Sequence, residues 1–391
     1  MKTHDVLVLG GGMIGSAVAF DLARTGRHRV TIADLREPAL PLVRGRADVA
    51  VRRADLSDPD AVRTLAAGFD VVVGALPSVL GHAALRAVIE AGTDVVDISF
   101  TAENALDLDG LARERGVTAV VDCGVAPGVS NLMVGHAAAQ LAAVDDVEIM
   151  VGGLPVERRW PFDYKAGFAP ADVIEEYVRP ARMVERGRVV TKEALSEPEL
   201  LDFPGVGTLE AFNTDGLRSL LFTINAPAMR EKTLRYPGHV ALMRAFRETG
   251  FFSKELVDVG GQRVRPLDTT AALLFPKWTF AEGEADLTVM RVAVRGRDAA
   301  GRGRRFAFDL LDHYDPETRL RSMSRTTAFP AAIMAGLVAD GAVPRPGVHP
   351  PEVLGALPGM LETVLSGLAA RGVRCRARVE EEHAIAAAAT A

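Results

Sequence analysis

The sequence predicts an α/β fold in which a doubly wound parallel sheet is followed by an inserted α+β domain. Over the first 130 residues, short apolar runs alternate with segments of helical periodicity, as in repeated strand–helix units. After about residue 145, strand-like segments alternate apolar with polar residues, which favours antiparallel strands with one exposed face. We therefore expect a first domain over 1–129, a second over 130–325, a helix returning to the first domain over 326–345, and a C-terminal extension over 346–391.

The first domain should begin with a buried strand, because the apolar run at 6–9 ends in glycines. Helical spacing that stops at Gly26 predicts the first helix, and Pro59 behind Asp58 suits the first turn of another. The expected helices cover 14–25, a segment from residue 59 onward, and 81–91. Further strands are expected at 30–33, 71–73, 95–98 and 118–122.

The second domain should contain half-exposed antiparallel strands, which the alternating segments predict at 147–151, 288–294 and 305–310. A helix is expected over 331–341, starting after Pro330, because proline fits the first turn of a helix. Four prolines within 344–351 predict an irregular segment, and the alanine-rich end from residue 384 should be frayed.

The composition excludes several classes of protein. The 391 residues are 48% hydrophobic and 25% charged, which is typical of globular chains, and the net charge of −6 gives no general attraction to nucleic acid or anionic membrane. Two cysteines, Cys123 and Cys375, cannot form a disulfide scaffold, and the scattered histidines suggest no metal site. No apolar stretch is long enough to cross a bilayer, and the short apolar run at 6–9 is no signal peptide, so we expect a cytoplasmic protein.

A glycine-rich turn follows the first predicted strand and opens the first predicted helix. Glycines at positions 10, 12 and 15 form the pattern G-x-G-x-x-G, which lets a backbone approach a pyrophosphate at a helix N-terminus. Asp34 ends the next strand, where its carboxylate can accept hydrogen bonds from ribose hydroxyls and repel a 2′-phosphate. NAD is therefore favoured as cofactor, although Arg36 could hold a 2′-phosphate. The residues expected at this turn are Gly10, Gly12, Met13, Ile14 and Gly15.

Two further strand ends could contact the same dinucleotide. Asp55 and Leu56 follow a predicted strand at a position that often lies beside the adenine, where Asp55 could bind the amine or cap a helix instead. The small residues Ala75, Leu76 and Pro77 end the next strand and would let the nicotinamide ribose pass, although an ordinary turn explains them too.

Carboxylates end two more strands at this edge of the sheet. Asp97 and Asp122 are candidates for catalysis or substrate binding, and either could equally be a structural hydrogen-bonding aspartate. Cys123 fits a small packed residue better than a nucleophile.

Three segments of the second domain mix aromatic, hydroxyl and cationic residues with glycine turns, as a site for a small polar ligand would. Tyr164, Thr214 and Arg218 lie in two of them. In the third, Arg235 could hold a carboxylate in bidentate fashion, and His239 could transfer protons near neutral pH. A surface ion pair and a satisfied histidine are the alternatives.

At these segments the chain resembles the saccharopine dehydrogenase family, and within it most closely the NAD-dependent lysine 6-dehydrogenases. The sequence D-C-G-V-A-P-G at 122–128 is similar to D-L-G-V-A-P-G of that group. Other matching segments are 152–156, 209–212, 232–239 and 323–329, and the similarity runs in order over about 5–345. Segments 163–165 and 213–218 differ from the lysine enzymes.

The resemblance implies a Rossmann domain closed by the inserted domain, a homodimer, and NAD-dependent oxidation of an amino acid amine, with lysine as the expected substrate. Hydride would leave the ε carbon, water would add to the imine, and ammonia would depart. Hydride transfer needs the neutral amine, and deprotonating an ammonium of pKa ~10.4 at pH 7 costs ~4.6 kcal/mol. Asp122, Tyr164 and His239 are candidates for the base, Arg235 for the carboxylate anchor, and Asp97, Thr214 and Arg218 for other substrate contacts.

Three other functions stay open. A saccharopine-type dehydrogenase would form or split a secondary amine between two amino acids, and Arg218 and Lys165 could supply cations for its additional carboxylates. A cyclodeaminase would retain NAD with no net redox change. A non-catalytic NAD-binding sensor would turn over no substrate.

Overall fold

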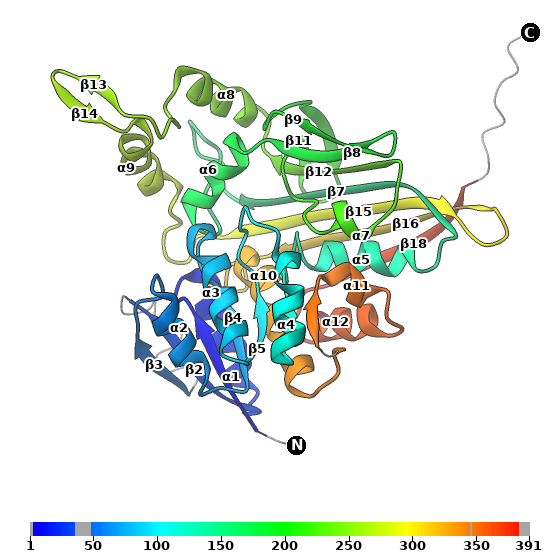
Figure 1. Ribbon diagram of the computed structural model, residues 1–391. Coiled ribbons are helices and arrows are strands. Elements are labelled where there is room, and N and C mark those ends of the chain that lie inside the picture. The colour runs from blue at the N-terminus through cyan, green and yellow to red at the C-terminus, as the bar shows by residue number, and fades with distance from the viewer. Residues whose placement is uncertain (1–2, 36–47, 345, 383–391) are drawn as a thin grey trace, which may run out of the picture.

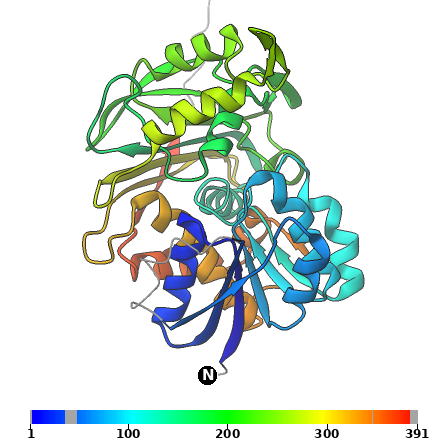
Figure 2. The same ribbon diagram turned by 90° about the vertical axis from the view of Figure 1, so that its left-hand side faces the viewer.

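Two large β-sheets, stacked with helices between them, form the structure, a computed structural model that describes residues 3–35, 48–344 and 346–382. Figures 1 and 2 show the parallel sheet of the first domain below the mixed sheet of the second. The predicted Rossmann-like domain with a second α+β domain is confirmed. Arg36 and the alanine-rich end from residue 384 lie outside the described residues.

The first sheet has seven parallel strands in the order β17-β6-β5-β4-β1-β2-β3. Its strands are β1 (His4–Leu9), β2 (His28–Asp34), β3 (Val49–Arg53), β4 (Val71–Gly74), β5 (Asp94–Asp97), β6 (Thr118–Val120) and β17 (Gly347–His349). The strand order reverses at β1, which lies between β2 and β4, and ligands bind at such a reversal beside the carboxyl ends of the strands.

Helices cover both faces of this sheet, which explains why its strands are continuous apolar runs. They are α1 (Met13–Arg24), α2 (Pro59–Ala66), α3 (Ser78–Glu90), the 3₁₀ turn η2 (Ala105–Leu108), α4 (Asp109–Arg115), α10 (Ser322–Ala339), α11 (Pro351–Gly355) and α12 (Met360–Ala369). Val6 and Val8 face the core that includes α1 and α10, whereas Leu7 and Leu9 face the core with α2 and α3.

The second sheet has nine strands, with the path β10-β11-β12-β7-β15-β16-β18; in addition, β8 pairs with β12, and β9 pairs with β8. The strands are β7 (Ala143–Pro155), β8 (Ala181–Glu185), β9 (Arg188–Lys192), β10 (Glu199–Phe203), β11 (Gly207–Asn213), β12 (Ala228–Arg235), β15 (Asp286–Arg297), β16 (Gly303–His313) and β18 (Cys375–Glu382). The helices of this domain are α5 (Val129–Ala138), α6 (Pro170–Val178), α7 (Leu220–Thr223), α8 (His239–Thr249) and α9 (Pro266–Trp278), and a separate hairpin comprises β13 (Val257–Val259) and β14 (Gln262–Val264).

The strand predicted at 147–151 is present, but only one of its two neighbours is antiparallel to it. It lies within β7, which pairs antiparallel with β15 but parallel with β12. The long connection between β7 and β12 permits this parallel crossover, and a local alternation of apolar residues cannot reveal it.

The predicted helix at 331–341 and the predicted irregular segment at 344–351 also need correction. α10 begins at Ser322, nine residues earlier than expected, and Pro330 lies inside it. Asp286 explains the early start, since its carboxylate accepts hydrogen bonds from the backbone N–H groups of Ser322 at 2.6 Å and Met323 at 3.0 Å. Within the proline-rich segment, β17 forms a three-residue edge strand, a position where neighbouring prolines lose no ladder hydrogen bond.

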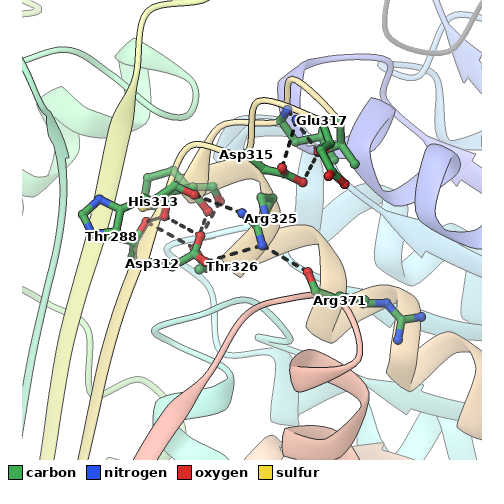
Figure 3. Close-up of polar contacts among 12 residues, drawn as sticks. Thr288, Asp312, His313, Asp315, Glu317, Arg325, Thr326 and Arg371 are labelled. Carbon is green, nitrogen blue, oxygen red and sulfur yellow. Dashed lines mark hydrogen bonds and ion pairs between the residues drawn. The ribbon is translucent and has the colours of Figure 1, made fainter.

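Arg325 connects α10 by hydrogen bonds to both the second sheet and the C-terminal part of the chain (Figure 3). Its guanidinium donates to the carbonyl oxygens of His313, at the end of β16, and of Arg371, each at 3.0 Å, and lies 3.6 Å from the Asp312 carboxylate. The side chain of Arg371 continues this network to Asp21 of α1 at 2.7 Å. The second sheet is thus linked through buried and half-buried polar groups to the helix that follows the glycine turn.

One apolar core is shared by the two domains. It contains Val8 of β1, Leu132 of α5, Ile149 of β7, Met290 of β15 and Phe329 of α10. The described part of the expected C-terminal extension belongs to both sheets, because β17 extends the first and β18 pairs with β16 of the second.

Candidate active site

A cavity of about 700 Å³ opens between the carboxyl ends of β1 and β4 and the second domain. The first domain contributes the glycine turn and the ends of its strands, and the second contributes α6, β7 and β12. Every residue predicted to bind cofactor lines this cavity: Gly10, Gly12, Met13, Ile14, Gly15, Asp34, Asp55, Leu56, Ala75, Leu76 and Pro77.

The glycine turn fits a dinucleotide. At Gly10, where φ is +100°, a Cβ would lie 2.4 Å from the Ala75 carbonyl oxygen, and at Gly15 it would lie 1.9 Å from the Gly10 carbonyl oxygen. These two glycines therefore allow strand, helix and neighbouring loop to approach closely. A Cβ at Gly12, the N-cap of α1, would meet no protein atom within 4 Å, so the space beside this helix N-terminus is open for a diphosphate.

Two carboxylates line the cavity near the glycine turn, one at the end of β2 and one just after β3. Asp34 accepts a hydrogen bond from the backbone N–H of Gly11 at 2.7 Å, which fixes its carboxylate beside the turn. Asp55 accepts from the backbone N–H and the hydroxyl of Ser57 at 3.0 and 2.6 Å. The cap of α2 is Asp58, whose side chain accepts from Asp60 N, so Asp55 is not the helix cap.

The second-domain side of the cavity is built on β12. Glu231, Thr233 and Arg235 alternate along this strand and all line the cavity, as residues on one face of a strand must. Thr214 also lines it, and its hydroxyl donates to the Glu231 carboxylate at 2.6 Å and lies 2.8 Å from the Thr233 hydroxyl.

Arg235 is engaged more fully than the sequence predicts. Its guanidinium lies 4.4 Å over the Tyr164 ring, and its two Nη groups donate to the Glu176 carboxylate at 2.7 Å and to the Leu234 carbonyl at 3.0 Å. Nε is buried and has no partner among the described residues. A guanidinium carries five N–H groups, and these two hydrogen bonds do not use all of them, so the expected bidentate anchor stays a prediction.

Helix α6 brings further charges to the same side. Asp172, Glu175 and Glu176 recur at helical spacing on its cavity face, and Arg179 follows as its C-terminal cap residue. Asp172 accepts hydrogen bonds from the hydroxyl and the backbone N–H of Ser78, and burial raises its pKa. Counting Asp215 and Glu231, five carboxylates but only two guanidinium groups line the second-domain side.

The structure corrects the placement of two predicted catalytic residues, Tyr164 and His239, which lie behind the cavity lining. His239 Nδ1 lies 3.1 Å from the Phe162 carbonyl, which can only accept a hydrogen bond, so Nε2 accepts one from the Tyr177 hydroxyl at 2.9 Å. Burial, followed by the charge of Arg235, lowers the pKa of His239 to about 3. Burial raises the pKa of Tyr164 well above its usual value. Neither group is suited to accept a proton from a substrate near neutral pH.

Asp122, Arg218 and Asp97 form a second buried cluster outside the main cavity. Arg218 pairs with Asp122 at 3.1 Å, donates to the Thr101 carbonyl, and lies 5.2 Å over the Phe100 ring. Burial raises the pKa of Asp97 to about 7, against the hydrogen bonds from Ser99. Of the seven residues expected to act on the substrate, Thr214 and Arg235 line the main cavity, whereas Asp97, Asp122, Tyr164, Arg218 and His239 do not.

Sequence reasoning missed the glutamates of the site, Glu176 and Glu231. Both left a signal, since Glu231 alternates with Thr233 and Arg235, and Glu176 shares a helical face with Asp172 and Arg179. Within the described ranges, no group of three histidine, cysteine or acidic residues could hold a metal ion, and no helix is long and apolar enough to cross a membrane.

Both halves of the chain match known family models. Residues 6–120 match the saccharopine dehydrogenase NADP binding domain, and residues 124–373 match the saccharopine dehydrogenase C-terminal domain.

Two curated relatives illustrate the sequence similarity. The chain is 24% identical over 277 residues to the mitochondrial alpha-aminoadipic semialdehyde synthase of Rattus norvegicus, which covers 67% of this chain and 30% of that protein. It is 22% identical over 427 residues to the saccharopine dehydrogenase (NADP(+), L-glutamate-forming) of Saccharomyces cerevisiae, which covers 89% and 93%. The chain thus spans less than a third of the rat protein but nearly all of the yeast one.

Solved structures share the fold. The apo saccharopine dehydrogenase (L-Glu forming) from Saccharomyces cerevisiae has a TM-score of 0.77 at 19% identity, covering 96% of this chain and all of that one. The homospermidine synthase from Legionella pneumophila, in complex with NAD, has a TM-score of 0.67 at 10% identity, covering 97% and 91%. With a nucleotide-binding turn in its first domain and family models matching both of its domains, the chain belongs to the saccharopine dehydrogenase family.

Proposed function

We propose that the protein is an NAD-dependent oxidoreductase that deaminates L-lysine at the ε carbon to the 6-semialdehyde. One observation carries this proposal: the cavity joins a dinucleotide-binding turn to a wall rich in carboxylates. A nicotinamide cofactor, when bound, supplies the acceptor for the hydride. The carboxylates favour a cationic substrate over an anionic one, because opposite charges attract strongly where water is excluded.

Different residues of the cavity bind the cofactor and the substrate. The glycine turn and Asp34 hold and orient the dinucleotide, while Thr214 and the guanidinium of Arg235 present hydrogen-bonding groups to the substrate. Arg235 is held rigidly by Glu176 and Tyr164, so the N–H groups that it does not use within the protein are available to the α-carboxylate without further ordering of the side chain.

The saccharopine-type reaction is the second candidate, because relatives of the chain carry that name. Such a substrate brings additional carboxylates that need cations. Arg218 is bound to Asp122 outside the main cavity, and Lys165 is paired with Glu284 at 2.5 Å. Neither of these two expected cations lines the main cavity, which favours the lysine reaction.

A substrate panel tests the proposal. Lysine, ornithine, other ω-amino acids and saccharopine are each incubated with NAD⁺ or NADP⁺ at alkaline pH, and reduced cofactor is followed by absorbance. We expect the protein incubated with lysine and NAD⁺, and with no other substrate, to give reduced cofactor, ammonia and a six-membered cyclic imine in equal amounts. The imine forms when the α-amine attacks the aldehyde. Turnover of saccharopine without turnover of lysine would establish the second candidate instead.

The cofactor preference is expected to depend on Asp34. We expect Asp34→Ser to weaken NAD⁺ binding and to improve NADP⁺ relative to it, since a charged acceptor for the ribose hydroxyls is lost. A hydrogen bond to a charged group contributes ~1.5–3 kcal/mol, which corresponds to a change in preference of about 10- to 150-fold. Calorimetric titration of both cofactors measures the change.

Asp58→Ser is the matched control, because it alters an aspartate that caps α2 while keeping a capping side chain. The proposed role of Asp34 is contradicted if the wild-type protein already prefers NADP⁺, or if Asp34→Ser changes the preference no more than the control does.

A further inference from the structure

Glu231 is a buried carboxylate at the cavity surface without a cationic partner. It is 5% exposed and lines the cavity from β12. Its Oε2 accepts hydrogen bonds from the Thr214 hydroxyl at 2.6 Å and from the backbone N–H of Gly216 at 3.1 Å. In the part of the chain that the structure describes, no lysine, arginine or histidine forms an ion pair with it, whereas Glu176 pairs with Arg235 and Asp215 pairs with Arg182.

The surroundings hold this carboxylate in one orientation. Because Thr214 donates its only hydroxyl proton to Glu231, the Thr233 hydroxyl must donate to Thr214, so a chain of hydroxyl groups ends on Oε2. A Cβ at Gly216 would lie 2.4 Å from Cδ of Glu231, so glycine makes room for the carboxylate. Hydrogen bonds that all end on one oxygen leave the other for a ligand.

We propose that Glu231 receives the primary ammonium group of the substrate and accepts its proton before hydride transfer. This inference deepens the proposed function and rests on it for the identity of the substrate, but the subsite itself requires only a primary alkylammonium group. The transfer moves one proton from nitrogen to a carboxylate oxygen, breaks one N–H bond, and leaves a neutral amine and a neutral carboxylic acid.

Glu231 and Arg235 lie four residues apart on the same face of β12, and both line the cavity. One ligand can therefore contact both side chains. Extended lysine, whose terminal nitrogen lies about 7–8 Å from its carboxylate across six bonds of ~1.5 Å, offers an ammonium group to Glu231 and a carboxylate to Arg235.

The charges around Glu231 suit proton transfer from an amine. Burial raises the pKa of Glu231 to about 8, against the hydrogen bond from Thr214 and together with the charge of Glu176. That value is closer to the pKa of an alkylammonium group, ~10.4, than an ordinary glutamate would be. The other charged groups on this side of the cavity are Asp172 and Glu175 of α6, Arg179 at its C-terminal cap, the paired Asp215, and Arg235.

Binding of simple probes tests the inference without turnover. The full-length protein, saturated with NAD⁺ or, should NADP⁺ bind more tightly, with that cofactor, is titrated calorimetrically with n-hexylammonium and with hexanoate, which share an alkyl chain but differ in charge. We expect wild type to bind hexylammonium in preference to hexanoate, and Glu231→Gln to weaken hexylammonium at least tenfold. The wild-type affinity should rise about tenfold between pH 7 and pH 9, as a carboxylate of pKa ~8 ionises while the amine stays charged, and the variant should lose this rise. Glu114→Gln, at an exposed position of α4 outside the cavity, is the control.

The outcomes separate this inference from the proposed function. If Glu231 is needed for hexylammonium but lysine is not oxidised, the amine subsite stands and the lysine reaction fails. If lysine is oxidised and Glu231→Gln leaves its KM and kcat unchanged, the subsite is overturned and the reaction stands. A folded wild type that binds no hexylammonium, or that prefers hexanoate, also overturns the inference, as does a Glu231→Gln variant that binds it like wild type.

Discussion

Gly12→Val is expected to abolish dinucleotide binding while the protein stays folded. The structure separates these effects, because a Cβ at Gly12 meets no protein atom within 4 Å and would project into the space left for the diphosphate. We expect the affinity for NAD⁺ or NADP⁺ to fall at least 100-fold, or ~2.7 kcal/mol, in calorimetric titrations. The thermal unfolding midpoint of the unliganded protein should change little.

Gly110→Val is the matched control, since this exposed glycine of α4 also has open space around its Cβ position and lies outside the cavity. It should bind the dinucleotide like wild type. If Gly12→Val keeps wild-type affinity, the diphosphate does not pass the glycine turn, and the proposed position of the cofactor is wrong.

Arg218→Met is expected to cause the largest loss of stability. Arg218 and Asp122 are 4% and 6% exposed in their side chains, and their ion pair is buried at 3.1 Å. Removing one partner of a buried pair leaves an uncompensated charge and costs ~3–5 kcal/mol. The midpoint of urea unfolding should fall clearly, and adding Asp122→Asn should recover part of the loss because the unpaired charge is then removed.

Arg29→Met is the comparison at the surface, where Arg29 pairs with Asp5 while 68% exposed. Water and salt screen an exposed pair, so this variant should unfold at nearly the wild-type midpoint. A stable Arg218→Met variant with a strongly raised KM would instead show that Arg218 contacts the substrate, as the sequence alone suggested.

The first domain could be predicted from the sequence because its signals are local. Each strand of the parallel sheet is a continuous apolar run, and the glycine turn and Asp34 stand at fixed positions relative to β1 and β2. For the same reason, every predicted cofactor residue lines the cavity.

The start of α10 could not be predicted, because its cap is supplied by a residue from another element. Asp286 lies 36 residues before Ser322 in sequence and reaches the helix only in the folded chain. Pro330 suggested a first turn, but it lies in the interior of the helix.

The substrate half of the site was predicted in part for a similar reason. Arg235 and His239 both stand in one motif. Arg235 at the end of β12 lines the cavity, whereas His239 at the start of α8 lies behind the cavity lining. The alternation of Glu231 with Thr233 and Arg235 could have placed it on the cavity side of the strand, but its significance depends on the absence of a cation paired with it in the described structure. Such an absence can be recognised only in three dimensions.

The route of the chain between the two sheets has a consequence for attempts to divide the protein. The chain leaves the first sheet after β6, returns through α10 to β17, and leaves again to form β18. A fragment that ends before residue 322 would therefore lack an edge strand of each sheet, together with the helix packed between them. Neither domain can be expressed as one continuous segment, and a chimera with a relative would have to exchange two separate pieces of sequence for each domain.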